Sequence, residues 1–431
     1  MQIEIAIIGG GAAGLYAAAI AADQYKERGE TPSIVVLEKM DRCGRKIALT
    51  GKGRCNLTNT KPWEEFALHI HPKNIFLKNA FYAMSNTKTM EFFEKIGLPL
   101  VTERGDRVFP QSMRAADVTQ ALLAYLKKRG VKIITGFEVK EISRNEDAGK
   151  IAPNPKGKEV SSGFKITAAY RSEEILAKKI ILATGGLSYP TTGSTGDGYV
   201  FAKCFGHKIA PCFPSLTALI PKNYRDDMYD ISLKNVEAQL IVDKDIVAKE
   251  FGDLDFTNGG IEGPIGFKLS RKGVQSIING QKVSLLLDLK PAISKTQLTD
   301  RIGRELEEYK ENRYTRDSDR VNFILPKLLP KNLIDPFLSL NTDLTIKNLP
   351  DKLKTWKFEI YSYVGYERCV ITAGGISLAD VSQKTMESKL TPGLYFAGEI
   401  LDLDGDTGGY NLQIAFSTAA LAALSAVRNG V

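Results

Sequence analysis

Cysteine and histidine are scarce in this sequence of 431 residues, which contains five cysteines and three histidines. The cysteine count is odd, and no two cysteines form a CxxC pair. A disulfide framework or a structural zinc site would need cysteines or histidines at regular spacings. The scarcity therefore argues against both, and it predicts reduced thiols and no bound metal.

Long uncharged apolar runs are also missing. The sequence has no uncharged apolar stretch of about 18 residues, the length that a membrane-spanning helix requires. The N-terminus does not show a basic segment followed by an apolar one, which is the pattern of a secretory signal. These absences predict no membrane span, and a cytoplasmic location is the default expectation.

Positive charge is in excess but is not concentrated. The formal net charge is +8, yet the sequence has no block of about five to eight lysines and arginines and no internal repeat. Anionic small ligands account for such a charge as well as RNA does. With 43% hydrophobic residues, the chain can bury a sizeable core in about two or three domains.

The N-terminal segment has the pattern of a dinucleotide-binding fold. An apolar run, 3–8, leads into a glycine turn and an alanine-rich helical pattern, and a second apolar run, 33–37, ends at Glu38. In such a βαβ unit the first glycine permits the tight turn, the second lets a pyrophosphate approach, and the third permits close helix packing. The acid after the second strand would bind a ribose diol. The predicted contacts are Gly9, Gly11, Ala12, Ala13, Gly14, Glu38 and Lys39.

Two distant segments favour FAD over NAD. Residues 178–199 contain an apolar strand followed by "ATGG", and residues 392–424 contain a strand, an acidic glycine loop and a long apolar helix. Both are similar to motifs of the two-dinucleotide-binding-domain flavoproteins, a resemblance that implies a ribityl-binding role for Glu399. It also implies FAD contacts from Val139, Thr184, Gly185, Gly186, Gly398, Asp406, Gly409, Tyr410, Asn411 and Leu412. A calcium loop at "DLDGDTGG" is disfavoured because the EF-hand spacing and its terminal glutamate are missing.

The segment "CGRKIALTGKGRCNLTN", residues 43–59, combines glycines with cations. Its cysteines are separated by eleven residues, so the CxxxxC pair of disulfide reductases is absent. Glycines let backbone amides approach a ligand, and cations suit phosphates or a reduced flavin. We therefore interpret the segment as a cationic strap to the flavin, although a solvated basic loop is an alternative. The predicted contacts are Gly44, Arg45, Lys46, Thr50, Gly51 and Asn56.

Together with "RVFPQSMRAADV" and "CVITAGGISLADV", these motifs resemble the BaiN/RdsA-like, or aminoacetone-oxidase-like, family of FAD-dependent oxidoreductases over almost the whole chain. The resemblance implies an α/β fold, with a Rossmann-like FAD-binding domain of three layers and a mostly parallel sheet. We expect this domain to be discontinuous, 1–200 and 350–431, with a small cap at 73–115. An inserted β-rich and helical substrate domain is expected at 201–349, and a hairpin at 142–158.

The expected activity is hydride transfer through flavin N5, with NAD(P)H as a transient reductant, because no second GxGxxG occurs in a strand-helix context. An enone-like small organic substrate, implied by the family, would need a donor for its carbonyl and a proton source. Tyr189, Thr191 and Tyr410 are the candidate catalytic residues. A flavin amine oxidase that uses O2 and an RNA-binding or macromolecule-binding flavoprotein are the alternatives, but nucleic acid is disfavoured as a partner. The oligomeric state is left open.

Overall fold

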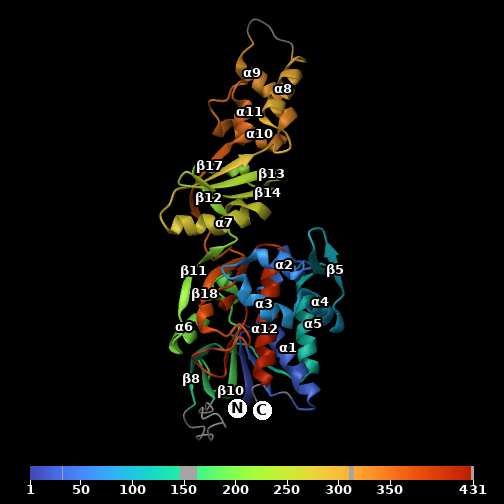
Figure 1. Ribbon diagram of the computed structural model, residues 1–431, viewed down its shortest axis with the longest axis vertical. Helices are drawn as coiled ribbons and strands as arrows, with labels where there is room; N and C mark the ends of the chain where they lie inside the picture. The colour runs from blue at the N-terminus through green and yellow to red at the C-terminus, as the bar shows by residue number, and fades with distance from the viewer. Residues whose placement is uncertain (32, 146–162, 310–314, 429–431) are drawn as a thin grey trace. The chain divides into compact units, whose positions relative to one another are not determined.

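The computed structural model describes residues 1–31, 33–145, 163–309 and 315–428, and the chain divides into two compact units. Unit 1 comprises Met1–Phe213 and Val370–Val431, and unit 2 is the insertion Pro214–Cys369 (Figure 1). The insertion thus begins and ends later than the boundaries of 201 and 349 expected from the sequence. The reason is that α6 (Asp197–Cys204) packs with β18 (Ile371–Ile376) of unit 1, whereas β17 (Trp356–Tyr363) completes a sheet of unit 2.

A mostly parallel sheet forms the centre of unit 1, in the strand order β7-β2-β1-β10-β9-β8, with β19 also paired to β10. Its strands are β1 (Gln2–Ile8), β2 (Ile34–Leu37), β7 (Lys132–Ile134), β8 (Val139–Arg144), β9 (Phe164–Ala168), β10 (Glu174–Leu182) and β19 (Leu394–Phe396). β7, β2, β1, β10 and β19 run parallel, while β8 and β9 are antiparallel. β8 and β9 pair antiparallel, but the hairpin expected at 142–158 lies outside the described residues except for 142–145.

Two apolar helices, α1 (Ala12–Glu27) and α12 (Tyr410–Arg428), pack against one another in unit 1. A Cβ on Gly14 would collide with the carbonyl oxygen of Gly9, so glycine is required where α1 approaches β1. α12 is long and apolar enough to span a membrane, but 78% of its most apolar window is buried inside the structure. Its contacts with α1 and with α3 (Asn74–Ala83) therefore account for its apolar composition.

Short elements surround this core. They include the helices α2 (Trp63–Phe66), α4 (Asn86–Lys95) and α5 (Ala115–Lys128), and the three-stranded sheet β3 (Thr58–Asn59), β6 (Arg107–Pro110) and β5 (Leu100–Glu103). β4 (Ile70–His71) pairs with β20 (Asp404–Gly405), and β11 (Ile209–Ser215) pairs with β18. The segment 73–115, which we expected to form a cap, consists of α3, α4, β5 and β6 within unit 1.

Unit 2 is a closed barrel with attached helices. The barrel order is β12 (Leu219–Pro221), β15 (Gly260–Glu262), β14 (Asp245–Thr257), β13 (Ile231–Val242), β16 (Val283–Asp288) and β17. The helices are α7 (Gly263–Ile278), α8 (Lys295–Leu306), α9 (Asp317–Leu328), α10 (Lys331–Leu340) and α11 (Leu349–Lys354). Trp356 packs on Phe358 at 4.6 Å and on Phe337 at 5.3 Å between ring centroids. The barrel and part of the helical region therefore share an aromatic core.

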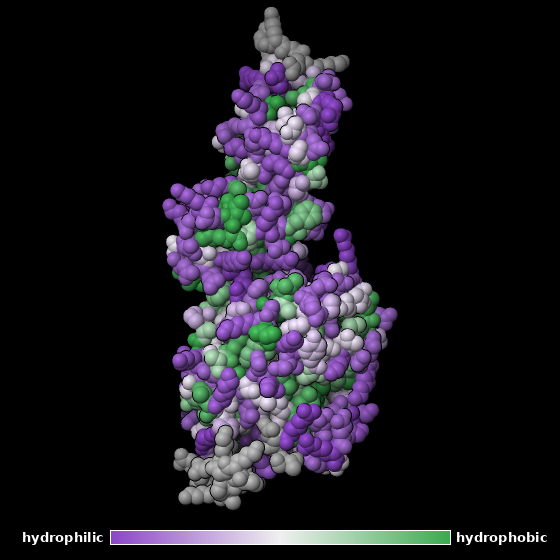
Figure 2. All heavy atoms as spheres, viewed as in Figure 1, coloured by the Kyte–Doolittle hydropathy of each residue, from purple (hydrophilic) through white to green (hydrophobic). Residues whose placement is uncertain are grey.

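The surface of unit 2 carries apolar side chains. Figure 2 shows such side chains on the face turned to the viewer, among hydrophilic ones. Strands β14 and β17 expose Ile246, Val247, Phe251 and Tyr361. Exposed apolar groups that gather on one element often mark a binding surface, whereas isolated ones do not.

Candidate functional site

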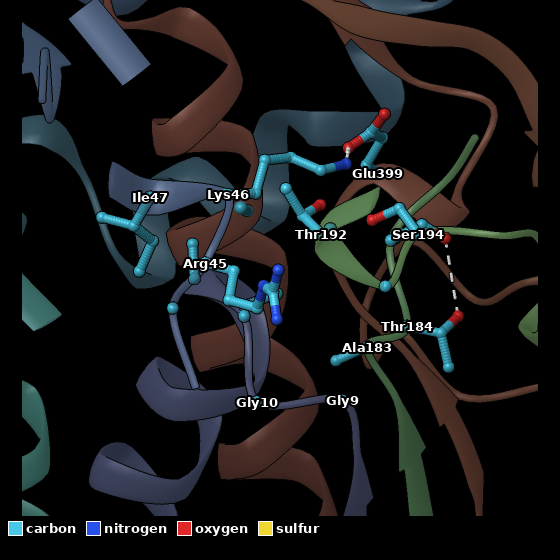
Figure 3. A pocket seen from close by; sticks show the side chains of 18 of the residues that line it. Gly9, Gly10, Arg45, Lys46, Ile47, Ala183, Thr184, Thr192, Ser194 and Glu399 are labelled. Carbon is cyan, nitrogen blue, oxygen red and sulfur yellow. Dashed lines mark hydrogen bonds and ion pairs between the residues drawn. The ribbon is translucent and has the colours of Figure 1, made fainter. Parts of the chain in front are cut away.

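A cavity in unit 1 lies at the carboxyl ends of the parallel strands β1, β2, β10 and β19 (Figure 3). It contains about 1280 Å³ of free space, part of which is open to solvent. Ligands of open α/β sheets bind at this edge because the glycine turns and helix N-termini gather there. The residues expected to contact the cofactor that line it are Gly9, Gly11, Ala12, Ala13, Glu38, Lys39, Gly44, Arg45, Lys46, Thr50, Val139, Thr184, Gly185, Gly398, Glu399, Asn411 and Leu412.

The N-terminus of α1 faces the cavity with its backbone amides. Gly11 is the N-cap, makes no side-chain cap bond, and has no atom within 4 Å of the position a Cβ would occupy. The first turn of α1 carries no acidic residue. Free N–H groups and the positive end of the helix dipole favour an anion. This end of the cavity therefore suits a diphosphate.

Glu38 lies directly after β2 and is oriented by two backbone amides. Its Oε2 accepts a hydrogen bond from Gly10 N at 2.7 Å, and its Oε1 accepts one from Met40 N at 2.8 Å. A carboxylate has about four acceptor positions, so each oxygen can still accept another donor. The geometry thus presents a fixed carboxylate to a hydroxyl pair, as on a ribose.

Lys39 follows β2 and contacts Thr195, in the loop before α6, and Asp197, the first residue of α6. Its Nζ lies 2.5 Å from Thr195 Oγ1 and 2.6 Å from Asp197 Oδ2. Lys39 and Asp197 both line the cavity. The bond joins two cavity walls that are 158 residues apart in the sequence.

Glu399 and Lys46 form an ion pair of 2.8 Å on the wall of the cavity, where Figure 3 shows the two side chains pointing toward one another. Ser188 Oγ donates to Glu399 Oε1 at 2.5 Å, and Thr372 N donates to the same oxygen at 3.0 Å. Burial would raise the pKa of Glu399, but the Lys46 ammonium and the hydrogen bonds from Ser188 and Thr372 outweigh it and lower this pKa. Glu399 is therefore an anion balanced by one cation.

The middle of the cationic strap forms a 3-10 helix, η1 (Ile47–Gly53), with a left-handed interruption at Gly51 (φ 58°) and Lys52 (φ 56°). Thr50 Oγ1 donates to Ile47 O at 2.7 Å, and Arg45 pairs with Asp41 at 3.0 Å. Arg45, Lys46 and Thr50 reach the cavity, whereas Gly51 does not line it. The strap thus contributes two cations to the site.

The two cysteines of the strap, Cys43 and Cys55, are free, buried thiols. Burial raises the pKa of Cys43 to about 12 and that of Cys55 to about 12. A thiol that stays protonated is a poor nucleophile. The structure therefore gives them a packing role.

The strap packs against the N-terminus of α12. With the Asn56 amide oriented to donate to Val108 O and Thr58 O, its oxygen accepts from Gly409 N at 3.0 Å. A Cβ on Gly409 would collide with the Thr58 carbonyl. Neither Asn56 nor Gly409 lines the cavity, so both position the walls instead.

Several other predicted residues are also placed away from the cavity lining. Gly186 packs against Thr372, and Asp406 is held by two histidines. Among the catalytic candidates, Thr191 is exposed, Tyr189 adopts a left-handed turn (φ 50°), and Tyr410 is buried between other rings. The residues not lining the cavity are Gly14, Gly51, Asn56, Gly186, Tyr189, Thr191, Asp406, Gly409 and Tyr410.

The lining also includes residues that sequence reasoning missed. Thr192 and Ser194 belong to the same polar glycine-rich loop as Tyr189 and Thr191, so the loop was identified but its cavity-facing members were not. Asp197 begins α6 directly after this loop. Phe201 lies on α6 and Ile371 on the returning strand β18. These two carry no local signal, because only packing brings them to the site.

The site fits FAD. Amides at the α1 N-terminus suit its diphosphate, Glu38 suits a ribose diol, and Arg45 and Lys46 supply positive charge. The α12 residues Asn411 and Leu412 close the opposite wall. The donor set therefore matches the chemistry of an adenine dinucleotide that extends along the sheet edge.

Comparison with known proteins identifies the family. The HI0933-like protein Rossmann domain matches residues 3–425. The chain is 30% identical over 430 residues to the 3-dehydro-bile acid delta(4,6)-reductase of Clostridium scindens, with 98% of each covered. It is 29% identical over 436 residues to the ribosomal RNA dihydrouridine synthase of Haemophilus influenzae, with 99% of this chain and 98% of the relative covered.

Among solved structures, the 3-ketosteroid delta1-dehydrogenase of Sterolibacterium denitrificans shares the fold. Its TM-score is 0.53 at 12% identity, over 99% of this chain and 100% of that chain. The family match and the two curated relatives extend over nearly the whole sequence. The chain therefore belongs to the HI0933-like, or BaiN/RdsA-like, family of FAD-dependent oxidoreductases.

Proposed function

We propose that this protein is an FAD-dependent reductase that adds a hydride and a proton to a carbon–carbon double bond conjugated with a carbonyl group. NAD(P)H is the proposed electron source, and an enone-like small organic molecule is the proposed acceptor. The carrying observation is the cavity at the sheet edge, whose amides, carboxylate and cations suit FAD. A cytoplasmic location stays a prediction.

The names of the curated relatives support this chemistry. A 3-dehydro-bile acid with a Δ4 double bond is an enone, and the relative from Clostridium scindens is named as a reductase of such a compound. Dihydrouridine is uridine with a saturated C5–C6 bond, and that bond is conjugated with a ring carbonyl in uridine. Both names thus describe reduction of a conjugated double bond, although the substrates differ greatly in size.

The proposed cofactor contacts follow the cavity from end to end. Glu38 would bind a ribose diol, and the α1 amides would bind the diphosphate. Lys46 and Glu399 would lie along the ribityl chain, with Asn411 closing the wall at the ring. When bound, FAD supplies a ring that accepts a hydride and passes it on.

The residues of the chain itself would tune this chemistry. The positive end of the α1 dipole would favour an anionic cofactor, while Lys46 holds Glu399 ionised on the cavity wall. The insertion, expected at 201–349 and described as unit 2, is proposed to bind substrate, and its exposed apolar side chains suit an apolar molecule.

A uracil base in RNA is the second candidate substrate. Residues 214–369 contain 24 Lys and Arg against 23 Asp and Glu, so nearly all of the net charge of +8 belongs to the FAD-binding unit. Net positive charge on that unit favours a polyanion, and such binding weakens steeply with salt. The relative from Haemophilus influenzae is named as a ribosomal RNA dihydrouridine synthase, so ribosomal RNA is the specific polyanion to test.

Anaerobic stopped-flow mixing tests the proposal. Holoenzyme is mixed with NADH or NADPH, and the reduced enzyme is then mixed with a 3-dehydro-4,6-diene bile acid, with unmodified ribosomal RNA, or with O2. We expect a nicotinamide to bleach the flavin and a conjugated acceptor to restore its absorbance. Failure of both nucleotides contradicts the proposed electron source, and rapid reoxidation by O2 alone, with peroxide release, favours an oxidase.

A further inference from the structure

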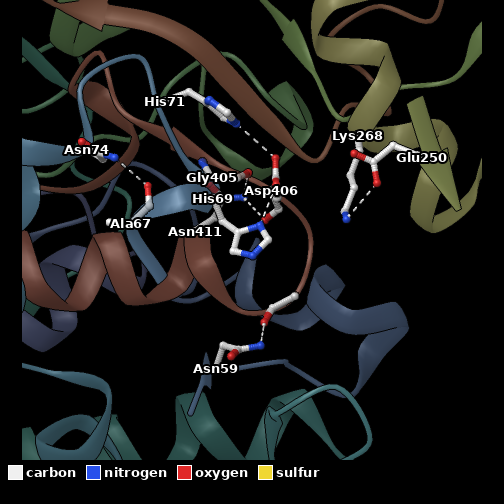
Figure 4. A network of polar contacts seen from close by, with 11 residues as sticks. Asn59, Ala67, His69, His71, Asn74, Glu250, Lys268, Gly405, Asp406 and Asn411 are labelled. Atoms are coloured by element: carbon white, nitrogen blue, oxygen red, sulfur yellow. Dashed lines mark hydrogen bonds and ion pairs between the residues drawn. The ribbon is translucent and has the colours of Figure 1, made fainter. Parts of the chain in front are cut away.

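Two of the three histidines in the sequence share one carboxylate in unit 1. Asp406 Oδ2 lies 2.9 Å from His69 Nδ1, and Asp406 Oδ1 lies 3.2 Å from His71 Nε2 (Figure 4). The β4–β20 pairing sets these side chains opposite one another, and Asp406 N donates to His69 O at 2.9 Å. Backbone pairing thus fixes the cluster, which the cofactor contacts described above do not use.

The hydrogen bonds decide which ring nitrogens can exchange a proton. An ionised carboxylate only accepts, so His69 Nδ1 and His71 Nε2 donate to Asp406. Burial would raise the pKa of Asp406, but the bonds and charges of the two histidines hold this pKa well below its usual range. Asp406 therefore stays an anion, and the bonds of His69 Nδ1 and His71 Nε2 leave His69 Nε2 and His71 Nδ1 turned away from it.

The cluster is partly open to solvent, and the loop that carries Asp406 borders the cavity, although none of the three side chains lines it. The side chains of His69 and His71 are 25% and 33% exposed, which lets water exchange protons with them. Asn411 lines the cavity, accepts from Gly405 N at 2.7 Å and donates to Gly405 O at 2.8 Å. Because Leu403 also lines the cavity, the loop that carries Asp406 begins and ends on the cavity wall.

The surroundings of the cluster are aromatic and charged. The Tyr410 ring stacks on His69 at 4.4 Å between centroids. Burial and the charges of Asp406, Asp106 and Glu65 raise the pKa of Tyr410, so its hydroxyl stays protonated. Lys61 lies 2.7 Å from Glu65 and 3.5 Å from Asp106, so its ammonium offsets part of their negative charge.

A metal site does not account for the cluster. The two histidine nitrogens bond to different oxygens of Asp406 and donate to them, so their lone pairs do not converge. Within the described ranges, no group of three or more His, Cys, Asp or Glu side chains could hold a metal ion.

We propose that His69 and His71, positioned by Asp406, form a proton relay that serves the substrate side of the cavity. The inference rests on the proposed function. In the reduction, the π bond of the conjugated C=C breaks, the β-carbon takes the hydride that originates from the nicotinamide, and the α-carbon takes a proton. The relay supplies that proton from an imidazolium N–H and regains one from water, so each turnover consumes one hydride and one proton. Asp406 is a positioning residue.

The test follows reoxidation separately from reduction. Holoenzyme is photoreduced without nicotinamide and mixed anaerobically with 2-cyclohexen-1-one or ribosomal RNA, in H2O and in D2O. For Asp406→Asn and His69→Ala we expect reoxidation to slow about 100-fold, the size of a lost general acid, with a larger solvent isotope effect. Bleaching by NADPH should be unchanged, because hydride transfer to the oxidised flavin needs no proton from the relay.

Three controls separate a relay from a structural role. Added imidazole should restore reoxidation in His69→Ala, which a packing defect would not allow. Lys61→Met changes a nearby charge outside the relay and should reoxidise at the wild-type rate. His71→Asn, at the more exposed histidine, replaces Asp406→Asn if that variant loses FAD or its folded circular dichroism spectrum.

The outcomes distinguish the two proposals. If no conjugated acceptor reoxidises the reduced wild-type enzyme, both the proposed function and the relay are contradicted. If the wild type is reoxidised and the histidine and aspartate variants match its rate and isotope effect, only the relay is overturned.

Discussion

At the scale of single residues, Glu399 shows how one buried charge depends on its partners. Its carboxylate accepts hydrogen bonds from the Lys46 ammonium and the Ser188 hydroxyl, and its pKa is lowered despite burial. Removing one member of a buried pair leaves the other uncompensated, which costs more than the pair itself contributes. The charge state of this residue therefore couples stability to pH.

The first prediction concerns that coupling. A carboxylate whose pKa is lower in the folded chain stabilises the fold fully above its ordinary value of 4.5, and this contribution is lost as pH falls below that value. The midpoint temperature of thermal unfolding of the apoprotein should therefore fall more steeply below pH 4.5 in the wild type than in Glu399→Gln. Equal slopes for the two proteins would contradict the assignment.

At the scale of elements, the helix α1 owes its position to one glycine. The missing side chain at Gly14 lets α1 approach the Gly9 carbonyl, and this approach brings the amides of the helix N-terminus to the cavity. Gly303 in α8 is a different case, because no atom lies within 4 Å of a Cβ built there and the residue is exposed. The two glycines form a matched pair.

We predict opposite effects of alanine at these positions. Gly14→Ala should destabilise unit 1 by about 2 kcal/mol or more, since the collision involves backbone, and it should weaken FAD binding. Gly303→Ala should stabilise unit 2 by about 0.5–1 kcal/mol, because alanine favours a helix interior. Urea unfolding measures the stability of each variant, and FAD fluorescence titration measures its affinity for FAD. If Gly14→Ala changes neither quantity, α1 can shift to accept the methyl group.

At the scale of the whole molecule, the FAD cavity belongs to one unit. All residues that line it come from Met1–Phe213 and Val370–Val431. The chain leaves this unit along β11 and returns along β18, and Ser377 N donates to Lys208 O at 2.9 Å between these segments. The points of exit and return are therefore neighbours in one small sheet.

This arrangement predicts the result of removing the insertion. Replacing residues 214–369 with a short Gly/Ser linker should leave a protein that binds FAD with the absorption spectrum of the full chain. The shortened protein should lose reoxidation by the conjugated acceptor if the insertion binds substrate. Retained turnover would remove the substrate role from unit 2, and loss of FAD would show that unit 1 needs the insertion to fold.

Local pattern predicted the parts of the site that depend on local backbone. The glycines at 9, 11 and 14 and the acid at 38 could be read from one βαβ segment, since turn geometry and helix packing constrain neighbouring residues. The distant motifs added Thr184, Glu399 and Asn411 by resemblance. Within the same polar loop, however, Tyr189 and Thr191 were selected where Thr192 and Ser194 line the cavity.

The sequence by itself determined the nucleotide-binding unit and predicted a β-rich insertion, because these follow from apolar periodicity and glycine turns within short segments. The family came from the resemblance of its motifs to those of known flavoproteins. Tertiary structure alone decided the Lys46–Glu399 pair, the His69–Asp406 contact and the closure of the barrel by β12 and β17. The paired residues are 353 and 337 positions apart. Such contacts depend on strand order and helix packing, which no local propensity specifies.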